Sequence, residues 1–99
     1  MASVDIPDEK LLTDEAVVGS TTTVTEGTKV TFTKSVLVGL PTVKSGDKLR
    51  WTTGEATIVS SNNKNYVVIS GSTAPTATTY VAIYKNLKGD NAATIEAII

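Results

Sequence analysis

The chain of 99 residues contains neither histidine nor cysteine, so the usual acid–base switch and the thiol nucleophile are absent. The candidates that remain are carboxylates, serine–lysine pairs and aromatic rings. Paired carboxylates hydrolyse glycosidic bonds when a cleft holds them several ångströms apart. The densest carboxylates of this chain are Asp5, Asp8, Glu9, Asp14 and Glu15. Because they lie in one polar segment, we interpret them as a solvated or partner-docking acidic segment.

A serine nucleophile in a chain without histidine needs a lysine as its base. Ser35 follows Lys34, and Ser45 follows Lys44. Neighbouring residues of a strand point to opposite faces, so neither pair has the spacing of a catalytic dyad. We therefore expect no enzymatic activity, no catalytic residue and no cofactor.

Oxygen ligands for calcium are available from Asp47, Asp90 and Asn91, but the chain lacks a D-x-D-x-D-G loop that would gather them. Turn formation explains these residues, and we expect no metal site. Lys88-Gly89-Asp90 is similar to an integrin-binding tripeptide. Such a sequence is common at hairpin tips, so we interpret it as a turn as well.

Aromatic rings could form a stacking platform for sugars or bases. The candidates are Trp51, Tyr66, Tyr80 and Tyr84. Only Tyr80 and Tyr84 share a face by their spacing. Core packing is the better interpretation of Trp51. For the two tyrosines the core, the sheet surface and a subunit interface all remain open.

The elements that position these residues show the two-residue period of β-strands. Val30 and Phe32 alternate with polar residues, and Leu49 and Trp51 do the same. Turn residues recur about every ten residues, a spacing typical of small barrels and sandwiches. The sequence therefore predicts an all-β fold, a small antiparallel β-barrel or sandwich, as a single domain over residues 16–99.

Three runs of this domain are more apolar than a solvent-exposed strand requires. Residues 66–70 and 80–85 are apolar on both faces, which indicates central strands or a surface covered by another chain. Residues 94–99 place Ile95, Ala97 and Ile99 on one face. We expect an interface that involves Tyr80, Tyr84, Ile98 and Ile99.

Residues 1–15 form the one segment of distinct charge. They carry five carboxylates against one lysine, a net −4, whereas the rest of the chain carries eight basic and five acidic side chains, a net +3. Pro7 disfavours a continuous helix across this segment. We predict an extended acidic N-terminal arm over residues 1–15, with Ile6, Leu11 and Leu12 as its anchors on a partner.

The whole chain has a formal net charge of −1. This balance provides no broad attraction to nucleic acid or to an anionic membrane. No segment approaches the roughly 20 apolar residues of a membrane-spanning helix. We expect neither nucleic acid nor a membrane as a partner.

Residues 36–84 resemble the small capsid decoration, or cement, proteins of tailed bacteriophages. The shared pattern is a Leu-Pro step, a Gly-Asp turn leading into a strand with an aromatic residue, a Thr-rich hairpin and a strand that begins after Asn. Its elements here are Leu40-Pro41, Gly46-Asp47, Trp51, residues 52–60 and Asn65 to Ile69. The chain departs from the family after that strand, where residues 71–79 replace a Gly- and Ala-rich turn.

The resemblance implies a structural virion protein, made in the host cytoplasm, that stabilises the outer surface of an icosahedral head by bridging capsomers. It implies the major capsid protein as partner and a homotrimer as the assembled form. The alternative function is a recognition module, such as a tail-fibre, adhesin or carbohydrate-binding domain. That module would use Tyr80, Tyr84 and the loop of residues 71–79.

Overall fold

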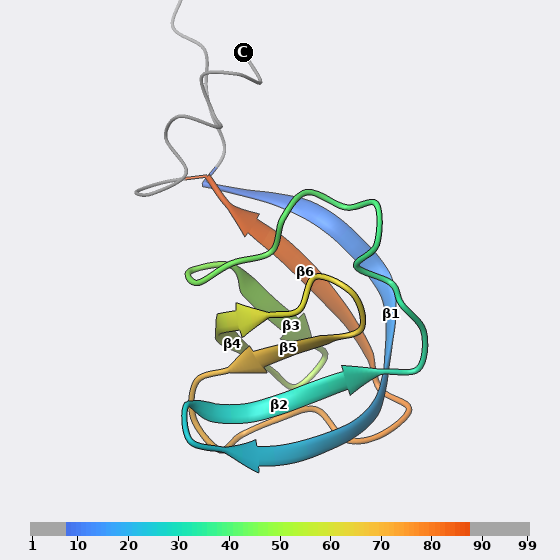
Figure 1. Cartoon of the computed structure of the whole chain (residues 1–99), viewed down its shortest axis with the longest axis vertical. Helices are drawn as coiled ribbons and strands as arrows, with labels where there is room; N and C mark the ends of the chain where they lie inside the picture. The colour runs from blue at the N-terminus through green and yellow to red at the C-terminus, as the bar shows by residue number, and fades with distance from the viewer. Residues whose placement is uncertain (1–7, 88–99) are drawn as a thin grey trace, which may run out of the picture.

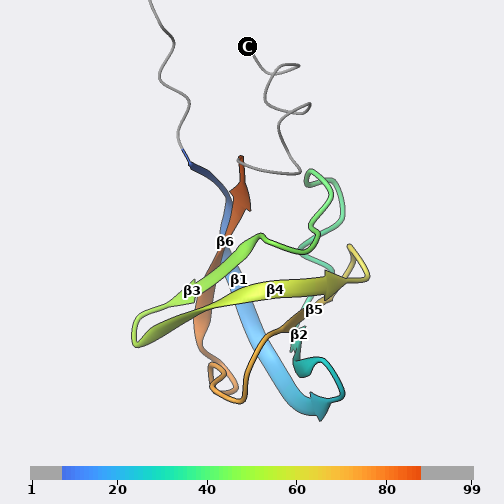
Figure 2. The same cartoon turned by 90° about the vertical axis from the view of Figure 1, so that its left-hand side faces the viewer.

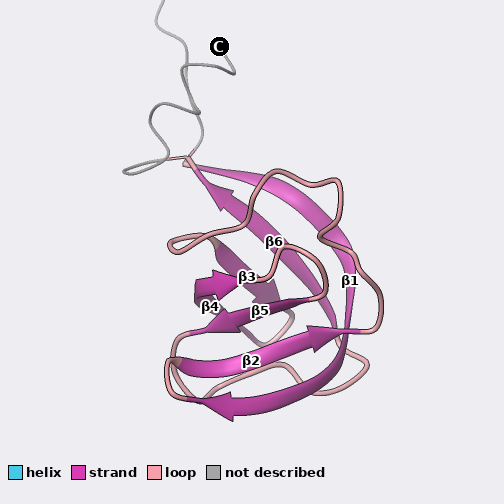
Figure 3. Cartoon of the chain, viewed as in Figure 1, coloured by secondary structure: helices cyan, strands magenta, loops and turns pink. Residues whose placement is uncertain are grey.

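The computed structural model describes residues 8–87, which form strands and loops and no helix (Figure 3). The strands are β1 (Glu9–Val24), β2 (Gly27–Phe32), β3 (Lys48–Trp51), β4 (Gly54–Ser61), β5 (Tyr66–Ile69) and β6 (Tyr80–Asn86). They close into a barrel in the order β1-β2-β5-β4-β3-β6, with antiparallel neighbours throughout (Figure 1). The predicted all-β class is confirmed, and of the two predicted architectures the barrel is correct.

Strand β1 closes the barrel because it has two successive neighbours. It pairs with β6 as far as Val17 and with β2 from Val18 onward. The pairing register of β1 shifts at three points, which lie between Leu11 and Thr13, between Thr13 and Ala16, and between Val18 and Ser20. Such bulges bend and twist a strand, which allows one segment to follow the curve of the barrel.

The N-terminal boundary of the barrel differs from the expected one. Strand β1 begins at Glu9, and Leu11 lies opposite Tyr84 of β6. The expectation of an arm up to residue 15 is therefore wrong for residues 9–15, because backbone pairing with β6 places them in the sheet. Residues 1–7 lie outside the described part of the chain.

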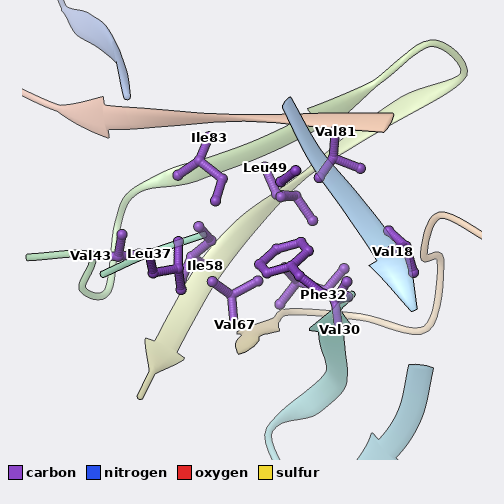
Figure 4. Packing of buried hydrophobic residues seen from close by; sticks show 12 residues of the cluster. Val18, Val30, Phe32, Leu37, Val43, Leu49, Ile58, Val67, Val81 and Ile83 are labelled. Carbon is purple, nitrogen blue, oxygen red and sulfur yellow. The ribbon is translucent and has the colours of Figure 1, made fainter. Parts of the chain in front are cut away.

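The barrel is filled by inward side chains from all six strands and from the loop of residues 33–47 (Figure 4). Val30, Phe32 and Leu49 are buried, as the two-residue period predicts. Trp51 is half-buried and packs against this core from the end of β3. Its predicted inward register is correct, but part of the indole remains open to solvent.

The loop of residues 33–47 covers one end of the barrel with Leu37 and Val43, both buried. The Leu37 N–H donates to the Lys64 carbonyl at 3.0 Å. The Val43 N–H donates to Oδ1 of Asn63 at 2.6 Å. These two bonds attach the loop to the β4–β5 connection and give it a fixed position.

Strands β5 and β6 each pair on both edges, as the central-strand alternative predicts. Their outer faces differ. Val68 on the outer face of β5 is only 6% exposed, and Lys29, its register partner on β2, lies beside it. The outer face of β6 is less covered, and the functional candidates lie there.

Candidate functional site

An apolar stripe follows the outer face of β6. Tyr80, Ala82 and Tyr84 alternate with the buried Val81 and Ile83 and therefore point outward. The β1 residues opposite the two tyrosines complete what we call the exterior stripe, defined as Leu11, Val17, Tyr80, Ala82 and Tyr84. The predicted common face of the two tyrosines is confirmed.

The exposed ends of the exterior stripe are Tyr80 and Leu11, at 67% and 45% exposure. Single apolar residues on a surface are ordinary, but an aligned set on one sheet face is a feature of interaction surfaces. The sequence predicted Leu11 and Leu12 as anchors of the arm. Leu12 is instead partly buried against the core, and of these two leucines only Leu11 faces outward. Ile6, Ile98 and Ile99 lie outside the described residues.

A charged cluster lies at the Tyr84 end of the exterior stripe. Arg50 on β3 makes a two-pronged ion pair with Glu9 on β1, in which Nη1 bonds Oε2 and Nη2 bonds Oε1, the latter at 2.8 Å. Its Nε donates to Glu55 at 3.1 Å. The guanidinium lies 4.6 Å from the centroid of the Tyr84 ring. We call these four residues the Arg50 cluster.

The Arg50 cluster links β1 and β3 across β6. The hydrogen bond to Glu9 is the largest cause that raises the pKa of Arg50 above its ordinary value; Glu55 adds to it, and desolvation opposes it. The guanidinium therefore stays charged at any pH at which the protein folds. The side chains of Arg50, Glu9 and Glu55 are 36%, 27% and 56% exposed, so solvent screens both pairs, and their contribution to stability is small. The guanidinium lies over the Tyr84 ring, which is the register partner of Leu11.

A cleft of about 350 Å³ lies between the β3–β4 turn and the loop before β6. One wall carries Trp51, Thr52 and Thr53, and the other carries Ala74, Pro75, Thr76 and Thr79. The lining combines Trp51 with four threonines and contains no charged residue, and the hydroxyls of Thr76 and Thr79 bond each other at 3.1 Å. An aromatic face with neutral hydroxyl groups is suited to a neutral polar ligand such as a sugar.

The four aromatic residues singled out in the sequence do not form one platform. Trp51 lines the cleft, while Tyr66 lies under the Lys29 ammonium, 4.2 Å from its ring centroid. Tyr80 and Tyr84 lie on the exterior stripe. The structure thus separates one aromatic cleft from one aromatic outer surface.

Asp47, directly before β3, forms a buried ion pair with Lys85 of β6. Asp47 is fully buried and Lys85 is 5% exposed. Oδ2 of Asp47 accepts from Lys85 Nζ at 3.2 Å and from the Lys44 N–H at 3.0 Å, and Oδ1 accepts from the Asn86 N–H at 2.9 Å. Lys85 Nζ also donates to the Thr42 carbonyl.

Sequence reasoning missed this pair. It interpreted Asp47 as a turn residue and did not single out Lys85. The signal was the period of β6, which places Lys85 on the inward face with Val81 and Ile83. A lysine at an inward position requires a buried partner, because an unpaired buried charge is costly. The pair joins the loop of residues 33–47 to β6 and fixes the Gly46-Asp47 turn.

Two further kinds of chemistry were weighed from the sequence, serine–lysine catalysis and metal binding. Ser35 with Lys34 and Ser45 with Lys44 are exposed, and no hydrogen bond joins the side chains within either pair. Within residues 8–87, no group of three acidic residues could hold a metal ion. The same residues contain no helix able to cross a membrane. Asp90 and Asn91 lie outside the described part.

Comparisons of the chain with protein-family models, with curated proteins and with solved structures find no match. The exterior stripe, the Arg50 cluster and the cleft beside Trp51 are therefore the features from which we infer a function.

Proposed function

We propose that this chain is a structural virion protein that decorates and stabilises the outer surface of an icosahedral phage head. The exterior stripe would contact the major capsid protein and bridge adjacent capsomers. The homotrimer implied by the resemblance is part of this proposal. Because many equivalent copies bind one shell, contacts that are individually weak together stabilise the shell strongly.

The exterior stripe is the observation that carries the proposal. In a closed barrel the inner face of the sheet surrounds the core, so the core cannot cover apolar side chains on the outer face. Tyr80 and Leu11 lie on that outer face and remain exposed. Tyrosine is enriched in protein interfaces because its ring is apolar and its hydroxyl bonds water or a partner. The Arg50 cluster next to the stripe supplies charged groups of the kind found at an interface rim.

The rigid environment of the Gly-Asp turn supports the same proposal. The resemblance rests partly on Leu40-Pro41 and Gly46-Asp47, and the buried Asp47–Lys85 pair holds this loop against β6. The same pair also holds β6, the strand that carries Tyr80 and Tyr84. Little conformational freedom is lost when a rigid strand surface binds, which favours affinity.

Substitution of the exterior stripe tests the proposal. The full chain with Leu11→Ser and Tyr80→Ser should bind phage heads that were assembled without it at least about tenfold more weakly than wild type, since central interface residues contribute above ~1 kcal/mol each. Co-sedimentation with the heads measures the affinity. Both side chains are exposed, so the thermal midpoint should stay unchanged.

Val38→Ser is the matched control, because Val38 is 63% exposed but lies on the loop of residues 33–47. It should bind like wild type. Unchanged head binding of the Leu11/Tyr80 variant would remove the exterior stripe from the interface.

The cleft beside Trp51 favours a second candidate, a glycan-recognition module. Thr53→Val and Thr76→Val keep the side-chain shape but remove two hydroxyls from opposite walls. If the cleft binds sugar, glycan-array binding should fall at least about tenfold, because a polar ligand group loses its partner. Thr33→Val, at an exposed position away from the cleft, is the control. The absence of any glycan bound by wild type would dismiss this candidate.

A further inference from the structure

The distal half of β1 has a free edge. β1 pairs with β2 up to Val24, but its pairing with β6 stops at Val17. The last backbone contacts on that second side are at Val18, which donates to the Thr79 carbonyl at 3.0 Å and accepts from the Thr78 N–H at 2.7 Å. From residue 20 to residue 24, no described residue forms a backbone hydrogen bond with this edge. The free edge lies on the β1–β2 hairpin, far from the end of β6 (Figures 1 and 2).

The alternation of hydrogen bonds defines which groups point outward. On β2, the Phe32 N–H bonds the Asn65 carbonyl on the β5 side, and the Thr33 N–H bonds the Val17 carbonyl on the β1 side. Odd-numbered β2 residues therefore face β1, and their partners at positions 20, 22 and 24 face β2. The backbone N–H and C=O groups of Thr21 and Thr23 consequently point away from the barrel.

The free edge lacks the charged residues and prolines that usually protect an edge, and the bulge of β1 between Val18 and Ser20 lies before it. Natural proteins block exposed edges with lysine, proline, bulges or covering segments. Residues 20–25 here are Ser-Thr-Thr-Thr-Val-Thr, without charge or proline, and residues 20–23 are exposed. Threonine and valine favour strands. An added strand could therefore bond the outward backbone groups of this edge, and no charged side chain of residues 20–25 would repel it.

We propose that the free edge binds residues 94–99 of a second copy of this chain as an added antiparallel or parallel strand. The segment Thr-Ile-Glu-Ala-Ile-Ile alternates in polarity over its first residues and contains neither glycine nor proline. Its six residues are enough to cover the five residues of the edge. Strand addition of this kind draws its affinity from main-chain hydrogen bonds.

The same chain cannot supply this strand in full. Residues 88–93, even fully extended, span about 20 Å at roughly 3.3 Å per residue. The seven residues of β6 already run about 23 Å back toward Tyr80, and the free edge begins beyond the register partner of Tyr80, Val17. Residue 94 of the same chain therefore falls short of the edge, whereas a neighbouring copy has no such restriction.

Proline substitution tests the proposal in the full chain. Thr21→Pro removes one outward N–H and leaves the bonds to β2 intact, and Ala97→Pro removes a donor from the added strand. Wild type should self-associate in analytical ultracentrifugation, and each variant should associate at least tenfold more weakly with a native circular dichroism spectrum. Thr21→Val, which keeps the N–H, should associate like wild type. Tyr80→Ser should also associate like wild type, which would show that the free edge and not the exterior stripe makes the contact between copies.

Mixing the variants identifies the occupant. The Thr21→Pro chain retains the segment and the Ala97→Pro chain retains the edge, so their mixture should form a one-to-one complex that neither forms alone. If Thr21→Pro fails to fold, a peptide of residues 92–99 with a solubilising lysine tag should dissociate the wild-type assembly. A strictly monomeric wild type, self-association that the peptide and both proline variants leave unchanged, or a mixture without complex would each overturn the proposal.

Discussion

Replacement of Asp47 by alanine is expected to destabilise the barrel by about 3–5 kcal/mol, because it leaves the buried Lys85 ammonium without its counter-charge. Asp47 is fully buried and accepts three hydrogen bonds, two of them from the backbone of Lys44 and Asn86. Its loss also releases the loop of residues 33–47 from β6. Denaturant unfolding should show a lower midpoint at an unchanged slope.

The partner variant separates the charge from the hydrogen bonds. Lys85→Met removes the ammonium. The double variant Asp47→Ala/Lys85→Met should therefore recover part of the stability that Asp47→Ala loses. The carboxylate that accepts from the backbone N–H groups of Lys44 and Asn86 is still missing, so recovery should be incomplete. A cost below about 1 kcal/mol for Asp47→Ala would show that water reaches this site and that the pair does not organise the loop.

Gly27→Ala is expected to destabilise the protein by roughly 3 kcal/mol or more, since the added methyl group collides with rigid backbone. A Cβ at this position would lie 2.0 Å from the Ile69 carbonyl oxygen. Ile69 belongs to β5, so the clash would separate β2 from β5 where Thr28 and Ile69 pair. The unfolding free energy from denaturant titration measures the effect.

Gly71→Ala is the matched control. Gly71 also has a positive φ, +86°, but a Cβ there meets no atom within 4 Å. Its cost should therefore be limited to the backbone strain of about 1–2 kcal/mol. Equal destabilisation by the two substitutions would mean that conformation, and not the close approach to Ile69, makes Gly27 necessary.

The barrel could be predicted from the sequence because its strands carry their own pattern. Val30, Phe32 and Leu49 alternate with polar residues, and that alternation depends only on the local backbone. The first half of β1 could not be predicted in this way. Its bulges break the two-residue period, and its strand state comes from pairing with β6, some 70 residues later in the chain.

The candidate site was predictable to a similar extent. The common face of Tyr80 and Tyr84 follows from spacing within one strand. The position of Leu11 beside Tyr84 depends on a register between two distant strands, which no local pattern contains. The Asp47–Lys85 pair is equally non-local, because each residue is explained only by the other. The Trp51 cleft needs a loop and a hairpin turn that meet only in the folded chain.

The most direct test of head decoration is cryo-electron microscopy of phage heads assembled without this chain and then incubated with the purified full chain. We expect added density for the barrel on the outer surface, between adjacent capsomers, with Leu11, Tyr80 and Tyr84 facing the shell. Heads without added density, or a barrel attached through another face with the exterior stripe open to solvent, would contradict it.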